Sequence, residues 1–244
     1  MKLIACLNIY NERENLPRCI EALRERGIFS IIVVDGVYRG YPHPEGREHS
    51  TDGTWEWLGL HGEAMGLLVA GPPEGGWPGQ EIKRTKYLRL ADTITEPGDW
   101  LLQVDADEFL VEDEPEPNMR GWRVREFLEN LPPHIEACWV HMYDVFRDRP
   151  MVPRGYYPKL LRWQPGLFYG REHWDVLTPN GQRLWRLDLQ LQAHDAALWP
   201  YFCFEHRTEL RDAVRMADKS RYEEFRIIER LRDGCMNPEP TAEV

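Results

Sequence analysis

Trp100-Leu-Leu-Gln-Val-Asp105-Ala-Asp107-Glu108 is the stretch that decides the fold. Its first five residues form a near-continuous apolar run, which is typical of a strand buried on both faces of a parallel sheet. Two aspartates then follow one residue apart, and burying bare carboxylates inside a sheet is costly. We therefore predict that Asp105 and Asp107 lie at the C-terminal end of the strand and face a crevice.

The Asp-x-Asp pair has two interpretations. Carboxylate oxygens at that point suit Mg²⁺ or Mn²⁺, and either cation can in turn hold a diphosphate. The alternative is a solvated acidic turn after an ordinary core strand, because three residues are too short a pattern to be specific. The rest of the chain distinguishes the two.

The first hundred residues alternate runs of strand length with helical stripes. Residues 3–7, 31–34 and 65–70 read as buried strands, whereas apolar spacing predicts helices over 16–23 and 87–94. Ser50-Thr-Asp-Gly-Thr54 is a helix-start signal. Such alternation predicts an α/β fold with a mostly parallel sheet. Polar residues that follow the strands would then share one edge of that sheet and mark a ligand crevice.

The texture changes after Phe109. Residues 112–118 are acidic and proline-rich, which predicts a loop or mobile flap, and a short helix is expected over 124–131. Strands are expected at 137–145 and 159–163, and a long charged helix from Thr208. This second half, 111–235, is interpreted as an elaboration of the same domain as 1–110, followed by a tail at 236–244.

Composition excludes some classes of protein. The 244 residues carry a net charge of −11, which disfavours a broad nucleic-acid-binding surface. Five scattered cysteines without a C-x-x-C pair indicate reduced thiols, and hence a cytoplasmic protein. No apolar run reaches the length of a membrane span.

Five motifs in succession resemble the GT-A glycosyltransferases, and specifically the family 2-like group. They are Leu3-Ile-Ala-Cys-Leu-Asn-Ile-Tyr-Asn-Glu12, Ile31-Ile-Val-Val-Asp-Gly36, Ser50-Thr-Asp-Gly-Thr54, Lys83-Arg84 and the Trp100–Glu108 stretch. The resemblance is best over the first 110 residues, the expected nucleotide-sugar-binding half. It implies a GT-A (Rossmann-like) sheet flanked by helices, with a C-terminal acceptor-side elaboration.

The resemblance also implies an activity, namely hexosyl transfer from a nucleotide diphosphate sugar, with UDP favoured, to an acceptor hydroxyl. Mn²⁺ or Mg²⁺ would be the cofactor, and inversion is expected. Carried over by position, the donor-binding residues would be Asn11, Glu12, Asp35, Asp52, Lys83, Arg84 and Asp105. Asp107 is the first choice for direct contact with the metal, Asp105 would hold ribose or metal, and the late His206 would complete the metal site. For His206 a satisfied core histidine is the alternative.

An inverting transfer needs a general base close to the acceptor hydroxyl. Asp175 is the first candidate, followed by Glu172 and His173, and each has the alternative of being a polar residue at a loop mouth. The segment departs from the family pattern, because its histidine and acid are separated by Trp174. A second departure is the insertion of residues 37–49 between Asp35 and the Ser50–Thr54 motif.

Two other classes of function remain open. One is a nucleotidyltransferase or nucleotide-sugar hydrolase on a similar fold, although Asn8-Ile-Tyr-Asn-Glu12 does not resemble a Gly-rich phosphate loop. The other is a non-catalytic nucleotide- or carbohydrate-binding module. The sequence does not identify the acceptor, for which a small molecule, a glycan, a peptide and a modified nucleic-acid base are all compatible.

Overall fold

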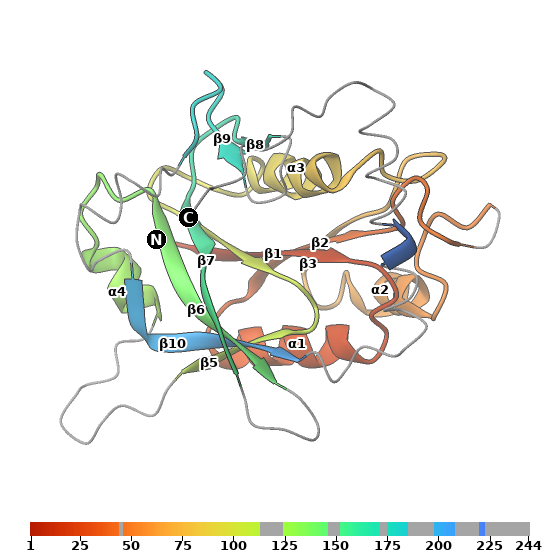
Figure 1. Ribbon diagram of the computed structural model, residues 1–244, viewed down its shortest axis with the longest axis horizontal. Helices are drawn as coiled ribbons and strands as arrows, with labels where there is room; N and C mark the ends of the chain where they lie inside the picture. Colours follow the sequence, from red (N-terminus) through yellow and green to blue (C-terminus); the bar gives the residue numbers. More distant parts are fainter. Residues whose placement is uncertain are drawn as a thin grey trace, which may run out of the picture.

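A mixed sheet of eight strands organises the described chain, in the order β3-β2-β1-β4-β7-β6-β10-β5 (Figure 1). The structure is a computed structural model that describes residues 1–43, 46–112, 124–145, 152–170, 175–184, 198–207 and 220–222. The strands of this sheet are β1 (Leu3–Ile9), β2 (Ser30–Asp35), β3 (Leu67–Ala70), β4 (Trp100–Val104), β5 (Glu108–Glu112), β6 (Ala137–Val145), β7 (Val152–Arg162) and β10 (Leu198–Arg207). A separate small sheet pairs β8 (Phe168–Tyr169) with β9 (Val176–Leu177). The helices are α1 (Asn15–Glu25), α2 (Thr54–His61), α3 (Gln80–Ala91) and α4 (Val124–Asn130).

The first four strands of the chain form the parallel half of the sheet. β2 and β4 flank β1, and β3 lies outside β2, all in parallel register. Every residue of β4 is buried, as its unbroken apolar sequence predicts. The chain order reverses between β1 and β4, and the carboxyl ends of strands at such a switch point are where open α/β sheets bind ligands.

Alternate residues of β1 contribute to two separate cores. Leu3, Ala5 and Leu7 pack in the core that includes residues of α1, α2 and α4. Ile4 and Cys6 pack in the second core, with residues of α3 and of the β8–β9 sheet. Figure 1 shows α3 and β8–β9 on one side of β1 and α1 on the other. Both faces of the parallel half are therefore covered by helices.

Helix α3 buries the face that its apolar residues predict, and two cations with it. The expected stripe ran through Tyr87, Leu90, Ala91 and Ile94. Tyr87 and Ala91 are fully buried, whereas Leu90 and Ile94 are partly buried and pack against the same core. The buried face of the helix also contains the cations Lys83 and Arg84. Charged side chains are rarely buried unless they are paired, so their partners identify a polar site under this helix.

The second half of the sheet is mixed in direction. β7 runs antiparallel to both β4 and β6, and β10 runs parallel to β6 and antiparallel to β5. The expected strands in 137–145 and 159–163 are confirmed as β6 and β7, whereas β5 and β10 were not predicted. Pro200 interrupts the apolar pattern of β10, and its pairing with β6 is irregular between Trp199 and Cys203. The predicted α/β class is confirmed, with a Rossmann-like parallel half-sheet flanked by helices and a second half of the chain that continues the same sheet.

The cysteines and helices bear on the remaining predictions from sequence. Cys6, Cys19 and Cys138 are buried free thiols. None of the helices within the described ranges combines the length and the apolar character needed to cross a membrane. The predicted flap beyond Glu112 and the predicted helix from Thr208 fall almost entirely outside the described residues.

Candidate functional site

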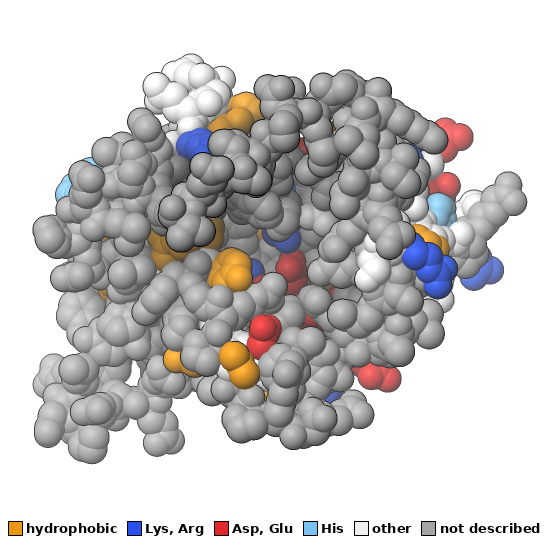
Figure 2. Space-filling view, viewed as in Figure 1, with side chains coloured by type: hydrophobic (Ala, Val, Ile, Leu, Met, Phe, Trp, Pro, Cys, Tyr) orange, Lys and Arg blue, Asp and Glu red, His pale blue; other side chains and the backbone are white. Residues whose placement is uncertain are grey.

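The candidate site lies where β1, β2 and β4 reach the same edge of the sheet. Asn11 and Glu12 follow β1, Asp35 ends β2, and Asp105 follows β4. On the face drawn in Figure 2, acidic and basic side chains lie next to each other near the centre. The structure thus brings the sequence-predicted residues of the donor half to one edge.

Asp35 is fully buried at the end of β2 and its carboxylate is occupied by the protein itself. Oδ2 accepts a hydrogen bond of 2.9 Å from the Ser50 amide, and Oδ1 accepts one from the Ser50 hydroxyl. His49 Nδ1 lies 3.6 Å from Oδ2, and its ring stacks on Trp55. Asp35 therefore anchors the C-terminal end of the inserted segment 37–49. This role is separate from any contact with the base of a nucleotide.

Asn11, Glu12 and Asp52 join the loop after β1 to the start of α2. The Asn11 amide donates to Ser50 Oγ at 2.8 Å, and Asn11 Oδ1 accepts from the Thr51 amide at 2.7 Å. The Glu12 amide donates to Thr54 Oγ1, and the Arg13 amide to Asp52 Oδ2, both at 2.9 Å. Asn11 has a φ of 55°, a left-handed conformation that asparagine tolerates. These hydrogen bonds fix the backbone of the loop after β1 against the start of α2.

Lys83 is buried beneath this edge of the sheet and connects two strand ends. Its Nζ donates to the carbonyl oxygens of Ile9 and Gly36, at 2.5 and 2.6 Å, and lies 5.1 Å from the centre of the Tyr38 ring. Burial lowers the pKa of Lys83 to about 7, although Asp35 opposes the shift. A neutral amine has two N–H donors, which matches the two carbonyls that Lys83 contacts.

Arg84 and Asp105 form a partly exposed ion pair after the end of β4. Arg84 Nη2 lies 3.1 Å from Asp105 Oδ1, and the Arg84 side chain is 10% exposed while that of Asp105 is 35% exposed. Burial lowers the pKa of Arg84, but Asp105 and the neighbouring tyrosines together outweigh burial, so the pKa is well above the ordinary value. Arg84 is therefore a permanent cation next to the Asp-x-Asp turn.

Behind Arg84, a buried chain of hydrogen bonds reaches the small β8–β9 sheet. Arg84 Nη1 donates to the Tyr87 hydroxyl, which bonds to the Tyr169 hydroxyl, and Tyr169 donates to Gln103 Oε1 at 2.6 Å. Burial raises the pKa of both tyrosines. Both tyrosines are therefore neutral and act only through hydrogen bonds. We call this chain, Arg84–Tyr87–Tyr169–Gln103, the tyrosine relay; it fixes Arg84 between α3, β4 and β8.

Asp107 and Glu108 complete the turn that follows β4, and both are buried. The Glu108 carboxylate accepts a hydrogen bond from the Asp105 amide at 2.9 Å, and its two oxygens lie 2.7 and 2.6 Å from Lys159 Nζ. Burial raises the pKa of Glu108, and the Lys159 ammonium opposes that rise. In the backbone register, His206 of β10 is paired with Glu108. The late histidine therefore lies on the strand next to the turn, and its side chain is outside the described part.

Asp175 is the described member of the three candidate bases. It is 8% exposed, its Oδ2 lies 2.9 Å from Arg183 Nη2, and its carbonyl oxygen accepts from the Gly170 amide. The next residue, Val176, pairs with Tyr169, whose hydroxyl reaches the β4 residue Gln103. Glu172 and His173 lie outside the described residues.

The donor chemistry of Asp105 and Asp107 fits a divalent cation that arrives with a diphosphate. Among the residues that the structure describes, no three His, Cys, Asp or Glu side chains form a group able to hold a metal ion. Mg²⁺ commonly takes only one or two carboxylates and completes its coordination with substrate phosphates and water. Two carboxylates are therefore sufficient for such a cation, but not for a permanently bound structural metal.

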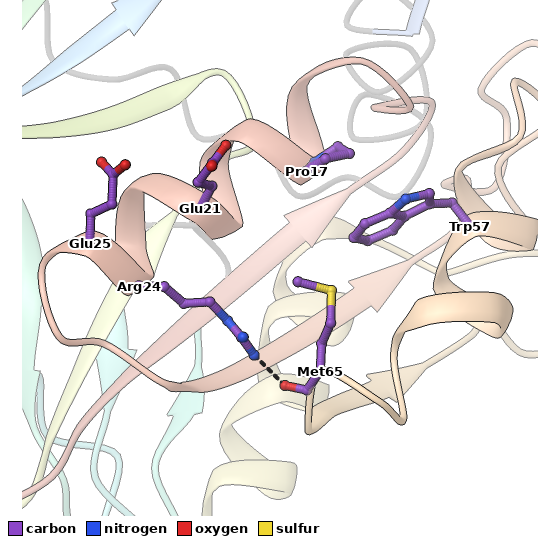
Figure 3. A pocket seen from close by; sticks show the side chains of 6 residues that line it. All are labelled: Pro17, Glu21, Arg24, Glu25, Trp57 and Met65. Carbon is purple, nitrogen blue, oxygen red and sulfur yellow. Dashed lines mark hydrogen bonds between the residues drawn. The ribbon is translucent and has the colours of Figure 1, made fainter.

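A pocket of about 540 Å³ lies elsewhere, between α1 and the segment from α2 to β3 (Figure 3). Trp57, Met65 and Pro17 supply its apolar lining, and Arg24 crosses it to donate to the Met65 carbonyl oxygen. None of the sequence-predicted site residues lines it. Its charged lining residues are Glu21, Arg24 and Glu25, which follow no strand end of the sheet. Because open α/β sheets bind ligands at their strand ends, we do not assign the chemistry to this pocket.

Sequence reasoning missed Lys159, Glu108 and Tyr169 as parts of this edge. For Glu108 the sequence did contain a signal, because it is an acid directly after Asp-x-Asp and begins the next strand, β5. Lys159 and Tyr169 come from β7 and β8, so only the tertiary fold reveals their partners. Trp77 is also part of this edge: it is buried, and its indole N–H donates to the Asp35 carbonyl oxygen at 2.7 Å.

No protein-family model and no curated protein matches this chain. Among solved structures, it is similar to a crystal structure of the 1–349 portion of S. aureus TarS, with 19% identity and a TM-score of 0.41. That match covers 62% of this chain and 38% of the TarS chain. A second crystal structure of S. aureus TarS matches at 18% identity and a TM-score of 0.40, over 63% of this chain and 23% of the other. At this identity and TM-score the similarity carries no argument about function.

Proposed function

We propose that this protein is a metal-dependent glycosyltransferase that transfers a sugar from a nucleoside diphosphate sugar to an acceptor hydroxyl. The observation that carries the proposal is the position of Asp105, Asp107 and Arg84 at the carboxyl edge of β4, next to β1. This is the switch point at which open α/β sheets bind ligands. There, Asp105 and Asp107 can bind a metal ion and Arg84 can bind a phosphate group.

Each described residue has a role in this proposal. Asp105 and Asp107 hold Mn²⁺ or Mg²⁺ together with the donor diphosphate. The cation, when bound, stabilises the negative charge that develops on the departing nucleoside diphosphate. Arg84 supplies a second positive charge on the same side, and Lys83 keeps the ends of β1 and β2 together under the nucleoside.

Asp175 is our choice for the general base. Arg183 pairs with its Oδ2, so we assign Oδ1 as the oxygen that accepts the proton of the acceptor hydroxyl. The hydroxyl oxygen then forms its bond to the anomeric carbon on the face opposite the bond to the departing nucleoside diphosphate, which gives inversion. Glu172 and His173 remain the next candidates, and His206 remains a candidate metal ligand because of its register next to Glu108.

The proposed transfer is tested by donor hydrolysis, since many transferases pass the sugar slowly to water. The protein is incubated with UDP-, GDP-, CDP- and ADP-hexoses, with Mn²⁺ or with EDTA, and the released nucleoside diphosphate is measured. We expect metal-dependent release from one donor class, most readily UDP-hexose, and its loss in Asp107→Asn. Binding of a nucleotide sugar without any release, even with pooled acceptor glycans, would favour the binding-module alternative.

A further inference from the structure

We propose that Glu108 and Lys159 are positioning residues through which the acceptor-side strand β7 sets the conformation of the Asp105–Asp107 turn. This inference rests on the proposed function, because it assumes that the turn binds a cation with a diphosphate. It assigns a role to two buried charges that the transfer chemistry itself does not use.

The turn is closed by two hydrogen bonds between its first and last residues. The Glu108 amide donates to the Asp105 carbonyl oxygen at 2.9 Å, as in a β-turn. The Asp105 amide donates in return to Glu108 Oε2, also at 2.9 Å. Asp107 lies between these two residues, so the same pair of bonds sets the direction of its backbone and thus of its carboxylate.

Lys159 fixes the carboxylate that makes this closure possible. Its Nζ contacts both oxygens of Glu108, at 2.7 and 2.6 Å, and the side chains are only 11% and 3% exposed. A buried ion pair contributes little net stability, because desolvation of both charges offsets their attraction. Its geometry is nevertheless well defined, and that suits a role in holding one conformation.

The pair also connects the two halves of the chain. β7 runs antiparallel to β4 with Leu160 opposite Leu102, so Lys159 lies toward the end of β4 where the turn begins. Lys159 and Glu108 are 51 residues apart in sequence. Residues that orient metal ligands in this way typically change metal affinity by about 10- to 100-fold when they are replaced.

Calorimetric titration of Mn²⁺ with each of UDP, GDP, CDP and ADP tests the inference in wild type, Lys159→Met and a control. The control is Arg162→Met, which also removes a cation from β7. Arg162 lies opposite Trp100, at the other end of β4, and donates to the Ile135 and Pro132 carbonyl oxygens. We expect Lys159→Met to weaken the Mn²⁺-dependent binding about tenfold or more. Binding without Mn²⁺ should change less, and Arg162→Met should bind like wild type.

The outcomes separate this inference from the proposed function. Unchanged Mn²⁺-dependent affinity in folded Lys159→Met would overturn the positioning role alone. An equal loss in Lys159→Met and Arg162→Met would also overturn it, since general destabilisation would then explain both. If wild type binds none of the four diphosphates with Mn²⁺, the proposed function fails and the positioning role with it. If Lys159→Met does not fold, the same titration is made with Glu108→Gln, which keeps the shape and an acceptor for the Asp105 amide while removing the charge that holds Lys159. Weaker Mn²⁺-dependent binding then supports the positioning role, and unchanged binding overturns it.

Discussion

Lys83 is the residue whose protonation most directly links the site to stability. Burial lowers its pKa to about 7 in the folded protein, whereas an unfolded lysine titrates near 10.4. Between these values the unfolded state binds more protons than the folded state, so Lys83 makes the free energy of unfolding rise with pH, by up to about 1.4 kcal/mol per pH unit. Below pH 7 both states are protonated and this dependence disappears.

We predict that Lys83→Met removes this dependence. Urea unfolding of wild type and variant at pH 6, 7.5 and 8.5 gives the difference between the two proteins at each pH, which cancels the titration of groups that both share. The difference should grow in favour of wild type from pH 7.5 to pH 8.5. A constant difference over the whole range would show that Lys83 keeps an ordinary pKa.

Lys83 and its neighbour Arg84 show what the sequence can and cannot predict about single residues. The resemblance singled out Lys83-Arg84 as a pair that would reach the nucleotide, and the structure places Arg84 next to Asp105. Its burial was not foreseen, because a lysine or arginine on a helix is usually solvated. The hydrogen-bond acceptors of Lys83 are the carbonyl oxygens of Ile9 and Gly36, which are far from it in the sequence, so no local pattern predicts them.

At the scale of elements, the tyrosine relay connects α3 and β8 to the donor strand. Tyr87 and Tyr169 are buried and their hydroxyl groups bond to each other. Removing either hydroxyl leaves a buried polar group without its partner, which typically costs about 1–3 kcal/mol. We predict losses of that size for Tyr87→Phe and Tyr169→Phe, measured by chemical unfolding.

The double variant tests whether the two hydroxyl groups act together. Because each loses its partner in the other's single variant, the double loss should be smaller than the sum of the two, with a coupling energy of at least about 0.5 kcal/mol. Strict additivity would contradict the relay.

The elements themselves were predicted unevenly, for physical reasons. β1, β2, β4, α1 and β6 carry unbroken runs or clear stripes and were predicted close to their observed bounds. β10 contains Pro200, and β5 begins inside the acidic stretch, so their pairing depends on neighbours that sequence does not reveal. The antiparallel insertion of β7 beside β4 was unforeseen for the same reason.

At the scale of the whole molecule, Tyr222 connects the last described residues of the chain to the segment inserted after Asp35. Tyr222 is buried and stacks on Tyr38 with ring centres 5.4 Å apart, and its ring centre lies 5.5 Å from that of Tyr41. Tyr38 and Tyr41 belong to the inserted segment, so two segments far apart in the sequence pack together. Composition and motifs gave no indication of this contact, because the aromatic partners are more than 180 residues apart.

We predict that Tyr222→Ala destabilises the protein by about 3 kcal/mol, as truncation of a buried aromatic ring does. Tyr222→Phe keeps the ring and should lose much less. Measuring both by urea unfolding tests the stacking, and a loss below about 1 kcal/mol for Tyr222→Ala would mean that the ring carries little packing energy.

The central claim is that the carboxyl edge of β1 and β4 binds a nucleoside diphosphate together with a divalent cation. Thermal unfolding tests it most directly, with UDP, GDP, CDP and ADP, each with and without Mn²⁺, on wild type, Asp107→Asn and the exposed-acid control Glu129→Gln. A ligand at 100 times its Kd stabilises the folded state by about 2.7 kcal/mol, which raises the Tm by about 5–10 °C for a chain of this size. We predict such a Mn²⁺-dependent rise with one diphosphate in wild type and Glu129→Gln, and its loss in Asp107→Asn. A Tm that no diphosphate changes, or a rise that Asp107→Asn retains in full, would contradict the claim.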